Sequence, residues 1–158
     1  RRTIVEIKEL GHLVLYVRDL EASTHFYRDV LGWRQTVRGG TQTLPFRASV
    51  FNAPSGRTHH ERLLIEVGPD AAALPPGRRV GLYHFGLKIG DNDDDLRQAL
   101  ATLQANGVTI VGASDHTVTH SLYILDPDGN EIELYIDVAG VDWDDPNRVA
   151  APIRPLVL

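Results

Sequence analysis

The chain has 158 residues, a formal net charge of −5, seven histidines, and neither cysteine nor methionine. This length predicts one compact domain, and the scattered basic residues argue against a nucleic-acid partner. The lack of cysteine excludes disulfides, thiolate catalysis and every sulfur-ligated metal centre, so any bound metal must use imidazole and oxygen ligands.

The first half of the chain predicts one strand, one helix and three further strands. Residues 12–19 show the alternating apolar pattern that is typical of a strand. Asp19 is a good N-cap for a helix that follows, and Gly32 is a natural stop for it. Strand-like segments come next at about residues 33–38, 46–52 and 61–67.

The second half repeats this order. Residues 84–91 resemble residues 12–19 at an offset of 72, so that His84 matches His12. A helix capped by Asn92 or Asp93 follows, and strand-like segments lie at about residues 108–112, 117–125 and 131–136. Both halves therefore predict the order β-α-β-β-β, and at about 60 residues neither buries much core alone.

We expect the two modules to pack into a single domain that spans residues 1–158. No apolar run reaches the ~20 residues that cross a bilayer and no signal peptide is visible, so we expect a cytoplasmic protein without a membrane partner. Because the chain lacks methionine, we expect residues before Arg1. The expected parts are module one at about 10–67, a linker at about 68–81, module two at about 82–137 and a docked C-terminal tail at 138–158.

A hairpin near the end of module two predicts which side chains face each other. The turn Asp-Pro-Asp-Gly-Asn at residues 126–130 is a strong turn signal. A hairpin centred on Asp128 pairs residues whose numbers sum to 256, so Tyr123 lies opposite Glu133 with Cβ atoms roughly 5 Å apart. A glutamate beside an aromatic ring on a concave face is costly unless it is paired or binds a metal.

The repeat puts His12 and His84 at equivalent points of related strands. Together with Glu133 they make two imidazoles and one carboxylate on three strands, the donor set of a facial triad with open metal positions. A single histidine at a strand start is more often a hydrogen-bonded structural residue. The metal hypothesis therefore depends on the repeat and the hairpin together.

A set of motifs runs through both modules: Gly11-His12, Phe26-Tyr27, Leu31-Gly32, His84, the turn at 126–130, and Ile132-Glu133-Leu134. This set resembles the vicinal oxygen chelate superfamily, which includes glyoxalase I, bleomycin resistance proteins and extradiol ring-cleavage dioxygenases. The resemblance covers about residues 10–137. It implies an α+β fold in which paired βαβββ modules form a cup-shaped mixed sheet around a metal held by His12, His84 and Glu133.

Further features resemble the extradiol dioxygenase branch. His60, His116 and Tyr123 match active-site positions of that branch, and residues 135–137 continue its glutamate strand. Typical members carry a second pair of modules, so the chain looks like their catalytic half. The stretch from His116 to Tyr123 is about two residues shorter than usual. The alternative residue, His120, differs in parity from Tyr123 and on a regular strand faces the other way.

The branch implies an Fe(II) enzyme that cleaves a catechol-type diol with O₂. His60 would be an acid or base, His116 would donate a hydrogen bond or proton to reduced oxygen, and Tyr123 would orient the diol. Mn(II), Zn(II) and Ni(II) stay open as metals, and short relatives are commonly homodimers. His25 and His59 are interpreted as ordinary surface residues.

Two other functions stay open. A glyoxalase-like isomerase or epimerase would use a fourth ligand on the last strand of module one, for which Glu66 is the candidate. A drug-binding resistance protein would lack catalysis and usually lacks the metal ligands, which the His-His-Glu set argues against.

Overall fold

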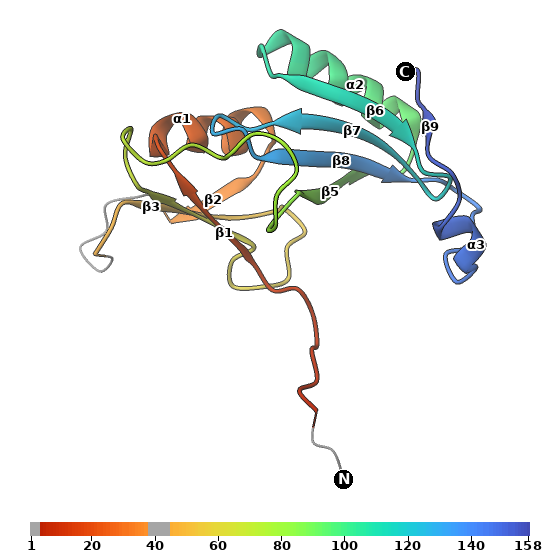
Figure 1. Cartoon of the computed structure of the whole chain (residues 1–158), viewed down its shortest axis with the longest axis horizontal. Coiled ribbons are helices and arrows are strands. Elements are labelled where there is room, and N and C mark those ends of the chain that lie inside the picture. The colour runs from red at the N-terminus through yellow and green to blue at the C-terminus, as the bar shows by residue number, and fades with distance from the viewer. Residues whose placement is uncertain (1–3, 38–44) are drawn as a thin grey trace. The chain divides into compact units, whose positions relative to one another are not determined.

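The computed structural model describes residues 4–37 and 45–158, which fall into two compact units. The first unit ends at Ala71 and the second begins at Ala72, inside the linker expected at about residues 68–81. Each unit holds one of the two expected modules, as Figure 1 shows. Their union in a single domain stays a prediction.

The first unit is a four-stranded mixed sheet with a helical segment against one face. The order of its strands is β1-β4-β3-β2, and only β1 and β4 are parallel. Residue 38 of the expected strand at 33–38 lies outside the described residues. The elements are β1 (Leu13–Val17), α1 (Leu20–His25), η1 (Phe26–Val30), β2 (Arg34–Val37), β3 (Ala48–Asn52) and β4 (Arg62–Glu66).

The helical segment of the first unit departs from the single regular helix that the sequence predicts. Asp19 caps it as expected, since its Oδ1 accepts the N–H of Ala22 at 3.0 Å. After His25 the backbone continues as the π-helical turn η1, a form that occurs mostly as single turns. This turn carries Phe26 and Tyr27, which are both buried although they are neighbours in the sequence.

A charged side chain lies in the core of the first unit. Arg62 of β4 is 2% exposed, beside the buried Leu64 and Phe51. Its guanidinium carbon lies 4.5 Å from the ring centre of Tyr27 and 5.1 Å from that of Trp33. The flat cation is therefore stabilised by two aromatic faces.

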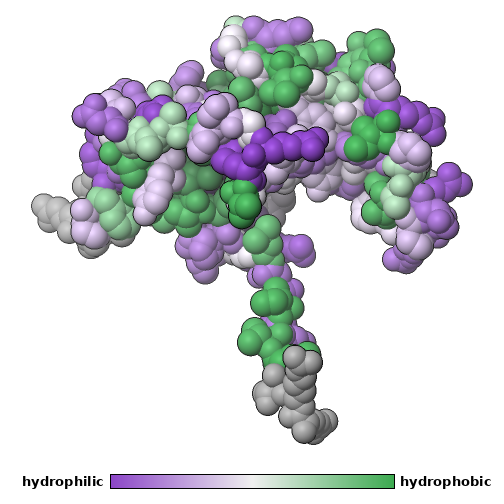
Figure 2. Space-filling model, viewed as in Figure 1, coloured by the Kyte–Doolittle hydropathy of each residue, from purple (hydrophilic) through white to green (hydrophobic). Residues whose placement is uncertain are grey.

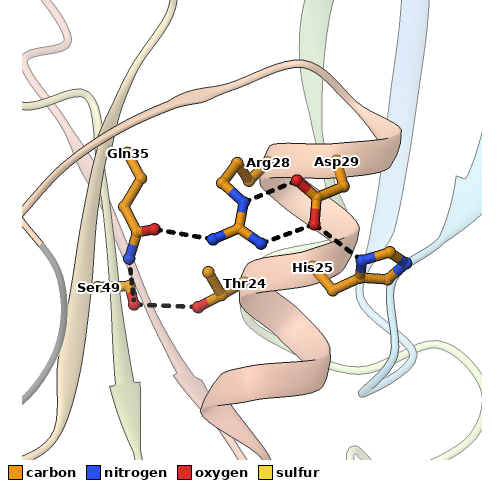
Figure 3. A network of polar contacts seen from close by, with 6 residues as sticks. All are labelled: Thr24, His25, Arg28, Asp29, Gln35 and Ser49. Carbon is orange, nitrogen blue, oxygen red and sulfur yellow. Dashed lines mark hydrogen bonds and ion pairs between the residues drawn. The ribbon is translucent and has the colours of Figure 1, made fainter.

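A chain of polar contacts joins the helical segment to β2 and β3 (Figure 3). Thr24 and Ser49 share a hydrogen bond of 3.0 Å, Gln35 donates to Ser49 at 3.3 Å, and Arg28 donates to Gln35 at 3.2 Å. Arg28 also donates twice to Asp29, at 2.7 Å each, which holds the pKa of that carboxyl well below its usual range. The network fixes the helix on the sheet at its solvent edge.

Residues 4–10 precede β1 without regular secondary structure. Figure 2 shows this segment as a largely hydrophobic stretch of surface. Its apolar side chains are almost fully exposed, so the core of the first unit begins only at β1. The side chains concerned are Ile4, Val5, Ile7 and Leu10.

The second unit repeats the strand order of the first and adds an edge strand. Its five-stranded sheet has the order β5-β8-β7-β6-β9, and only β5 and β8 are parallel. The expected α+β fold with two βαβββ modules is confirmed. The elements are β5 (His84–Gly90), α2 (Asp93–Ala105), β6 (Ile110–Asp115), β7 (Thr119–Leu125), β8 (Glu131–Asp137), α3 (Pro146–Val149) and β9 (Arg154–Pro155).

The hairpin of β7 and β8 has the predicted register. Tyr123 lies opposite Glu133, and the residue numbers of all the remaining pairs also sum to 256. Asp126 holds the turn, because its Oδ1 accepts the N–H groups of Asp128 and Asn130 at 2.9 and 2.8 Å. The pairing fixes which residues of both strands share a face.

Even-numbered residues of β7 and β8 form the core of the second unit with α2. Leu96 and Leu103 of α2 are fully buried against this face of the sheet. The buried strand residues are Leu122, Ile124, Ile132, Leu134 and Ile136. The odd-numbered residues consequently point to the face away from the helix, which we call the open face.

The C-terminal tail, expected to be irregular and docked, contains a short helix and a short strand. α3 is one turn long, and β9 pairs with the end of β6. No helix in the described parts of the chain is long and apolar enough to cross a membrane.

Candidate active site

His84 and Glu133 meet on the open face of the second unit. His84 begins β5, and Glu133 lies on the adjacent parallel strand β8, two residues after the partner of His84. The distance from His84 Nε2 to Glu133 Oε2 is 3.2 Å, and the two side chains are 26% and 17% exposed. Two of the three predicted ligands therefore come together in a half-buried position.

Polar side chains surround the other carboxylate oxygen. Ser121 donates to Glu133 Oε1 at 2.6 Å, and the hydroxyl of Tyr123 donates to the same oxygen at 3.3 Å. His116 Nε2 lies 2.6 Å from the Tyr123 hydroxyl. Two hydroxyl groups thus hold Oε1, while Oε2 is the oxygen nearest His84.

The environment keeps Tyr123 protonated. Burial, together with the negative charge of Glu133, raises the pKa of Tyr123 to about 12. A phenol has only one proton to donate. When that proton goes to Glu133, the phenol oxygen can accept a hydrogen bond from a protonated Nε2 of His116. The order Ser121, Glu133, Tyr123, His116 is thus a connected polar network.

The pair fits two neighbouring ligands of a metal ion. Two donors that each lie ~2.1 Å from one metal at right angles are ~3 Å apart, close to the spacing of Nε2 and Oε2. His84 Nδ1 is buried and has no hydrogen-bond partner among the residues that the structure describes. Within residues 4–37 and 45–158, no three His, Asp or Glu side chains gather so as to hold a metal by themselves.

The remaining predicted ligand, His12, lies in the first unit, one residue before β1. Its ring centre is 4.5 Å from that of His60, whose ring is in turn 4.4 Å from His59. Thr58 fixes this loop by donating to the carbonyls of His60 and Gly11 at 2.7 and 3.3 Å. The first unit therefore brings together two predicted site residues, His12 and His60.

The clustering of imidazoles affects protonation. Burial, reinforced by the positive charges that His59 and His12 would carry, lowers the pKa of His60. His60 is thereby favoured in its neutral form, which can accept a proton. His59, interpreted from sequence as an ordinary surface residue, is exposed but lies against His60.

The register of the two sheets shows which positions are equivalent. Leu13, next after His12, pairs with Arg62, and Phe85, next after His84, pairs with Ile132. Leu63 in the first unit therefore occupies the position of Glu133 in the second. No carboxylate stands at this point of β4.

Glu66, the candidate for a fourth ligand, has a structural role. Its Oε2 accepts the N–H of Leu20 at 2.9 Å at the start of α1, and its Oε1 pairs with Arg47 at 2.6 Å. Glu66 pairs with the buried Val17, which puts it on the helix side of the sheet. By strand parity His12 lies on the opposite side.

His120 faces away from Glu133, as its parity predicts. Its Nδ1 lies 2.6 Å from Asp93 in the first turn of α2, and its Nε2 lies 3.6 Å from Asp115. Asp115 also accepts the N–H of Thr117, whose φ is +71°. His120 therefore connects the helix to the turn between β6 and β7. His25 is exposed and pairs with its helical neighbour Asp29 at 2.9 Å.

A cavity of about 280 Å³ adjoins Glu133 on the open face of the second unit. This cavity was not identified from the sequence. Strand parity could have placed Tyr135 and Asp137 in its lining, because both residues share the parity of Glu133 on β8. The contribution of Trp143 depends on the path of the tail, for which the sequence has no comparable signal. The lining residues are Val118, Thr119, Glu133, Tyr135, Asp137 and Trp143.

Two βαβββ modules with this strand order define the glyoxalase/dioxygenase class of α+β proteins. A model of the Glyoxalase/Bleomycin resistance protein/Dioxygenase superfamily matches residues 9–134, and the chain belongs to this superfamily. A glyoxylase/bleomycin resistance protein/dioxygenase domain from Frankia sp. EAN1pec has the same fold. Its TM-score is 0.68 at 23% identity, over 84% of this chain and 99% of that one.

Curated relatives include dioxygenases. The chain is 36% identical to catechol-2,3-dioxygenase of Bacillus subtilis (strain 168) over 89% of its own length and 46% of that protein. It is 33% identical to biphenyl-2,3-diol 1,2-dioxygenase 3 of Rhodococcus globerulus over 81% of its own length and 63% of that protein. The chain thus spans about half to two thirds of these relatives.

Proposed function

We propose that this chain is the catalytic module pair of an Fe(II)-dependent extradiol dioxygenase that cleaves a catechol-type diol with O₂. The observation that carries the proposal is the open-face network of the second unit. There the His84–Glu133 pair, which fits a metal, lies beside the hydroxyl of Tyr123 and the imidazole of His116. The relatives named as diol dioxygenases support the same reaction class.

His12, His84 and Glu133 would hold the metal. Two neutral imidazoles and one carboxylate leave a divalent ion with net positive charge and with open positions. When bound, the ion would lower the pKa of a coordinated diol and bring the diol and O₂ to one centre. Fe(II) is the proposed metal, with Mn(II), Zn(II) and Ni(II) as alternatives for the same donors.

The remaining site residues would orient the diol and transfer protons. Tyr123 stays a neutral phenol and would orient the diol by a hydrogen bond beside Glu133. His116, which is hydrogen-bonded to Tyr123, would donate a hydrogen bond or proton to the reduced oxygen. His60, favoured in its neutral form, would accept the proton of the diol hydroxyl.

The four-ligand isomerase is the weaker candidate. It needs a fourth carboxylate on β4, where Leu63 occupies the position equivalent to Glu133. Glu66 caps α1 and pairs with Arg47 instead. A three-ligand site with more open positions suits a reaction that brings two reactants to one metal.

Reconstitution with Fe(II) under nitrogen, followed by a catechol panel and air, tests the proposal. We expect oxygen uptake and a yellow ring-opened product. His84→Ala should lose iron, whereas His60→Ala should keep iron and lose turnover. Iron at full stoichiometry in His84→Ala would refute the ligand assignment. Metal binding with isomerase activity and no oxygen uptake would favour the glyoxalase-like function.

A further inference from the structure

We propose that Asp115 is a positioning residue for His116. Its carboxylate holds the turn between β6 and β7 in a strained conformation, and that conformation places the imidazole of His116 against the hydroxyl of Tyr123. The inference rests on the proposed function for its consequence in turnover, whereas the placement of His116 can be measured without any reaction.

The turn that joins β6 and β7 has an unusual backbone. The N–H of Val118 donates to the carbonyl of His116 at 2.8 Å, which closes a γ-turn around Thr117. Thr117 has a φ of +71° and is the one residue other than glycine with a positive φ in the described parts of the chain. This form of the γ-turn is rare and strained, and a β-branched residue adopts it with particular difficulty. A contact outside the turn must therefore hold it.

Asp115 supplies that contact. Its Oδ1 accepts the N–H of Thr117 at 2.7 Å, in the manner by which aspartate side chains commonly stabilise turns. The backbone makes its own bond across the same turn, from the N–H of His116 to the carbonyl of Thr119 at 2.9 Å. Because the first contact comes from a side chain, its removal releases Thr117 and leaves the pairing of the two strands in place.

His120 supports Asp115 from the helix side of the sheet. The two residues are direct partners in the pairing of β6 with β7, so their side chains share a face. His120 Nε2 lies 3.6 Å from the same Oδ1, and its Nδ1 lies 2.6 Å from Asp93 in the first turn of α2. The carboxylate that holds the turn is thereby connected through one imidazole to the helix.

The turn presents a site residue on the opposite side of the sheet. His116 follows Asp115 in the chain, and its imidazole lies on the open face. Its Nε2 lies 2.6 Å from the Tyr123 hydroxyl and 3.9 Å from Glu133 Oε1. A return of Thr117 to an ordinary negative φ would change the path of the backbone and move this ring. A misplacement of ~1 Å can slow a reaction about 100-fold, so the support from the helix side should affect turnover.

Substitutions can separate this role from a general effect on folding. Asp115→Ala removes the acceptor, whereas Asp115→Asn keeps an oxygen that can accept the N–H of Thr117. Thr117→Gly removes the need for the acceptor, because glycine adopts a positive φ without steric cost. The double variant Asp115→Ala/Thr117→Gly should therefore recover what Asp115→Ala loses. Asp94→Ala is the matched control, since it removes a nearby carboxylate that is exposed and pairs with Arg97.

Nitrogen-15 NMR of the imidazoles in the full chain without added metal, with His116 assigned by its loss in His116→Gln, measures the placement. We expect the His116 signals to shift in Asp115→Ala and to return to their wild-type positions in Asp115→Asn and in the double variant. After loading with Fe(II), Asp115→Ala should keep its iron and lower kcat for catechol about 10-fold, with KM changed less than about 2-fold. Asp94→Ala should match wild type in each measurement.

Unchanged His116 signals in Asp115→Ala, or no recovery in the double variant, would overturn the positioning role. If Asp115→Ala does not fold, the double variant decides: wild-type signals support the role, and displaced signals or an unfolded chain refute it. The expected shifts in a protein that consumes no oxygen with any diol would support the positioning of His116 and refute the dioxygenase function. Oxygen uptake in wild type, with unchanged signals and kcat in Asp115→Ala, would leave the proposed function standing without the positioning role.

Discussion

The two modules repeat one strand order, yet they differ at equivalent positions of their sheets. In the second module the open face carries the carboxylate of Glu133 and the hydroxyl groups of Tyr123 and Ser121, whereas the first module has apolar side chains at the three equivalent positions. The first module instead presents imidazoles from the loop before β4 and the entry to β1. The equivalent pairs are Glu133 and Leu63, Tyr123 and Val50, and Ser121 and Ala48.

The cores and helix anchors differ as well. Arg62 in the first module occupies the position of the fully buried Ile132 in the second. A carboxylate on the sheet, Glu66, caps α1. In the second module an imidazole on the sheet, His120, binds the first-turn Asp93 of α2. The same strand order thus accommodates different local chemistry, and the open-face network of Ser121, Glu133, Tyr123 and His116 belongs to the second module.

The largest effect should come from the carboxylate that distinguishes the modules. Glu133→Gln removes the charge but keeps the shape, and we expect iron affinity to fall by more than about 100-fold, because even residues that only support ligands cost 10- to 100-fold. Metal analysis after dialysis measures this. Leu63→Met, at the equivalent position, should keep its iron. Comparable iron loss in both variants would mean that the difference between Glu133 and Leu63 does not determine where iron binds.

The cores should respond unequally to substitution. Ile132→Ala should lower the free energy of unfolding of the second module by about 2–4 kcal/mol through loss of burial and cavity formation. Arg62→Met keeps a side chain of similar size but loses the stacking on Tyr27 and Trp33. We therefore expect it to lower the free energy of unfolding of the first module by about 1 kcal/mol. Urea unfolding followed by circular dichroism compares them. A larger loss for Arg62→Met would reverse the ranking.

The helix anchor of the second module should have a smaller effect. His120→Ala leaves Asp93 without its partner at 2.6 Å, which should cost about 1–2 kcal/mol and loosen the start of α2. Hydrogen exchange of the first amides of α2 measures this directly. His25→Ala, an exposed histidine that also pairs with an aspartate, is the control. Unchanged exchange in His120→Ala would show that the N-cap Asn92 is sufficient.

The smallest effect should be the pH dependence of the Arg28–Asp29 contact in Figure 3. The folded pKa of Asp29 lies below the unfolded value of about 3.9, so the stabilisation is complete above that value and is lost as the pH falls below it. Asp29→Asn should therefore lower the melting temperature at pH 7 and approach wild type near pH 2. The exposed Asp70→Asn should show no such convergence. If the melting temperatures of Asp29→Asn and wild type differed by the same amount at all pH values, the Arg28–Asp29 contact would not be the cause of the difference.

Local rules were sufficient for much of the fold and part of the site. The turn at 126–130 and the parity of strands predicted that Tyr123 faces Glu133 and that His120 faces away. These features depend on neighbours within one hairpin. The repeat at an offset of 72 likewise predicted the two modules.

Other features depend on contacts distant in sequence. Arg62 is buried where its guanidinium lies over the rings of Tyr27 and Trp33. No local pattern indicates this contact or the π turn that carries Tyr27. The place of Trp143 in the lining of the same pocket as Glu133 depends on how the tail returns to the sheet. The meeting of His12 with His84 and Glu133 depends on how the modules pack, and it stays a prediction.

The most direct test of the central claim is the fate of ¹⁸O₂ in a single-turnover reaction of the Fe(II) protein with 2,3-dihydroxybiphenyl or catechol. A dioxygenase puts both atoms of one O₂ molecule into the ring-opened product, and mass spectrometry should find two labels in wild type and no product in Glu133→Gln. Unlabelled product, or release of labelled peroxide with the diol ring intact, would contradict the account.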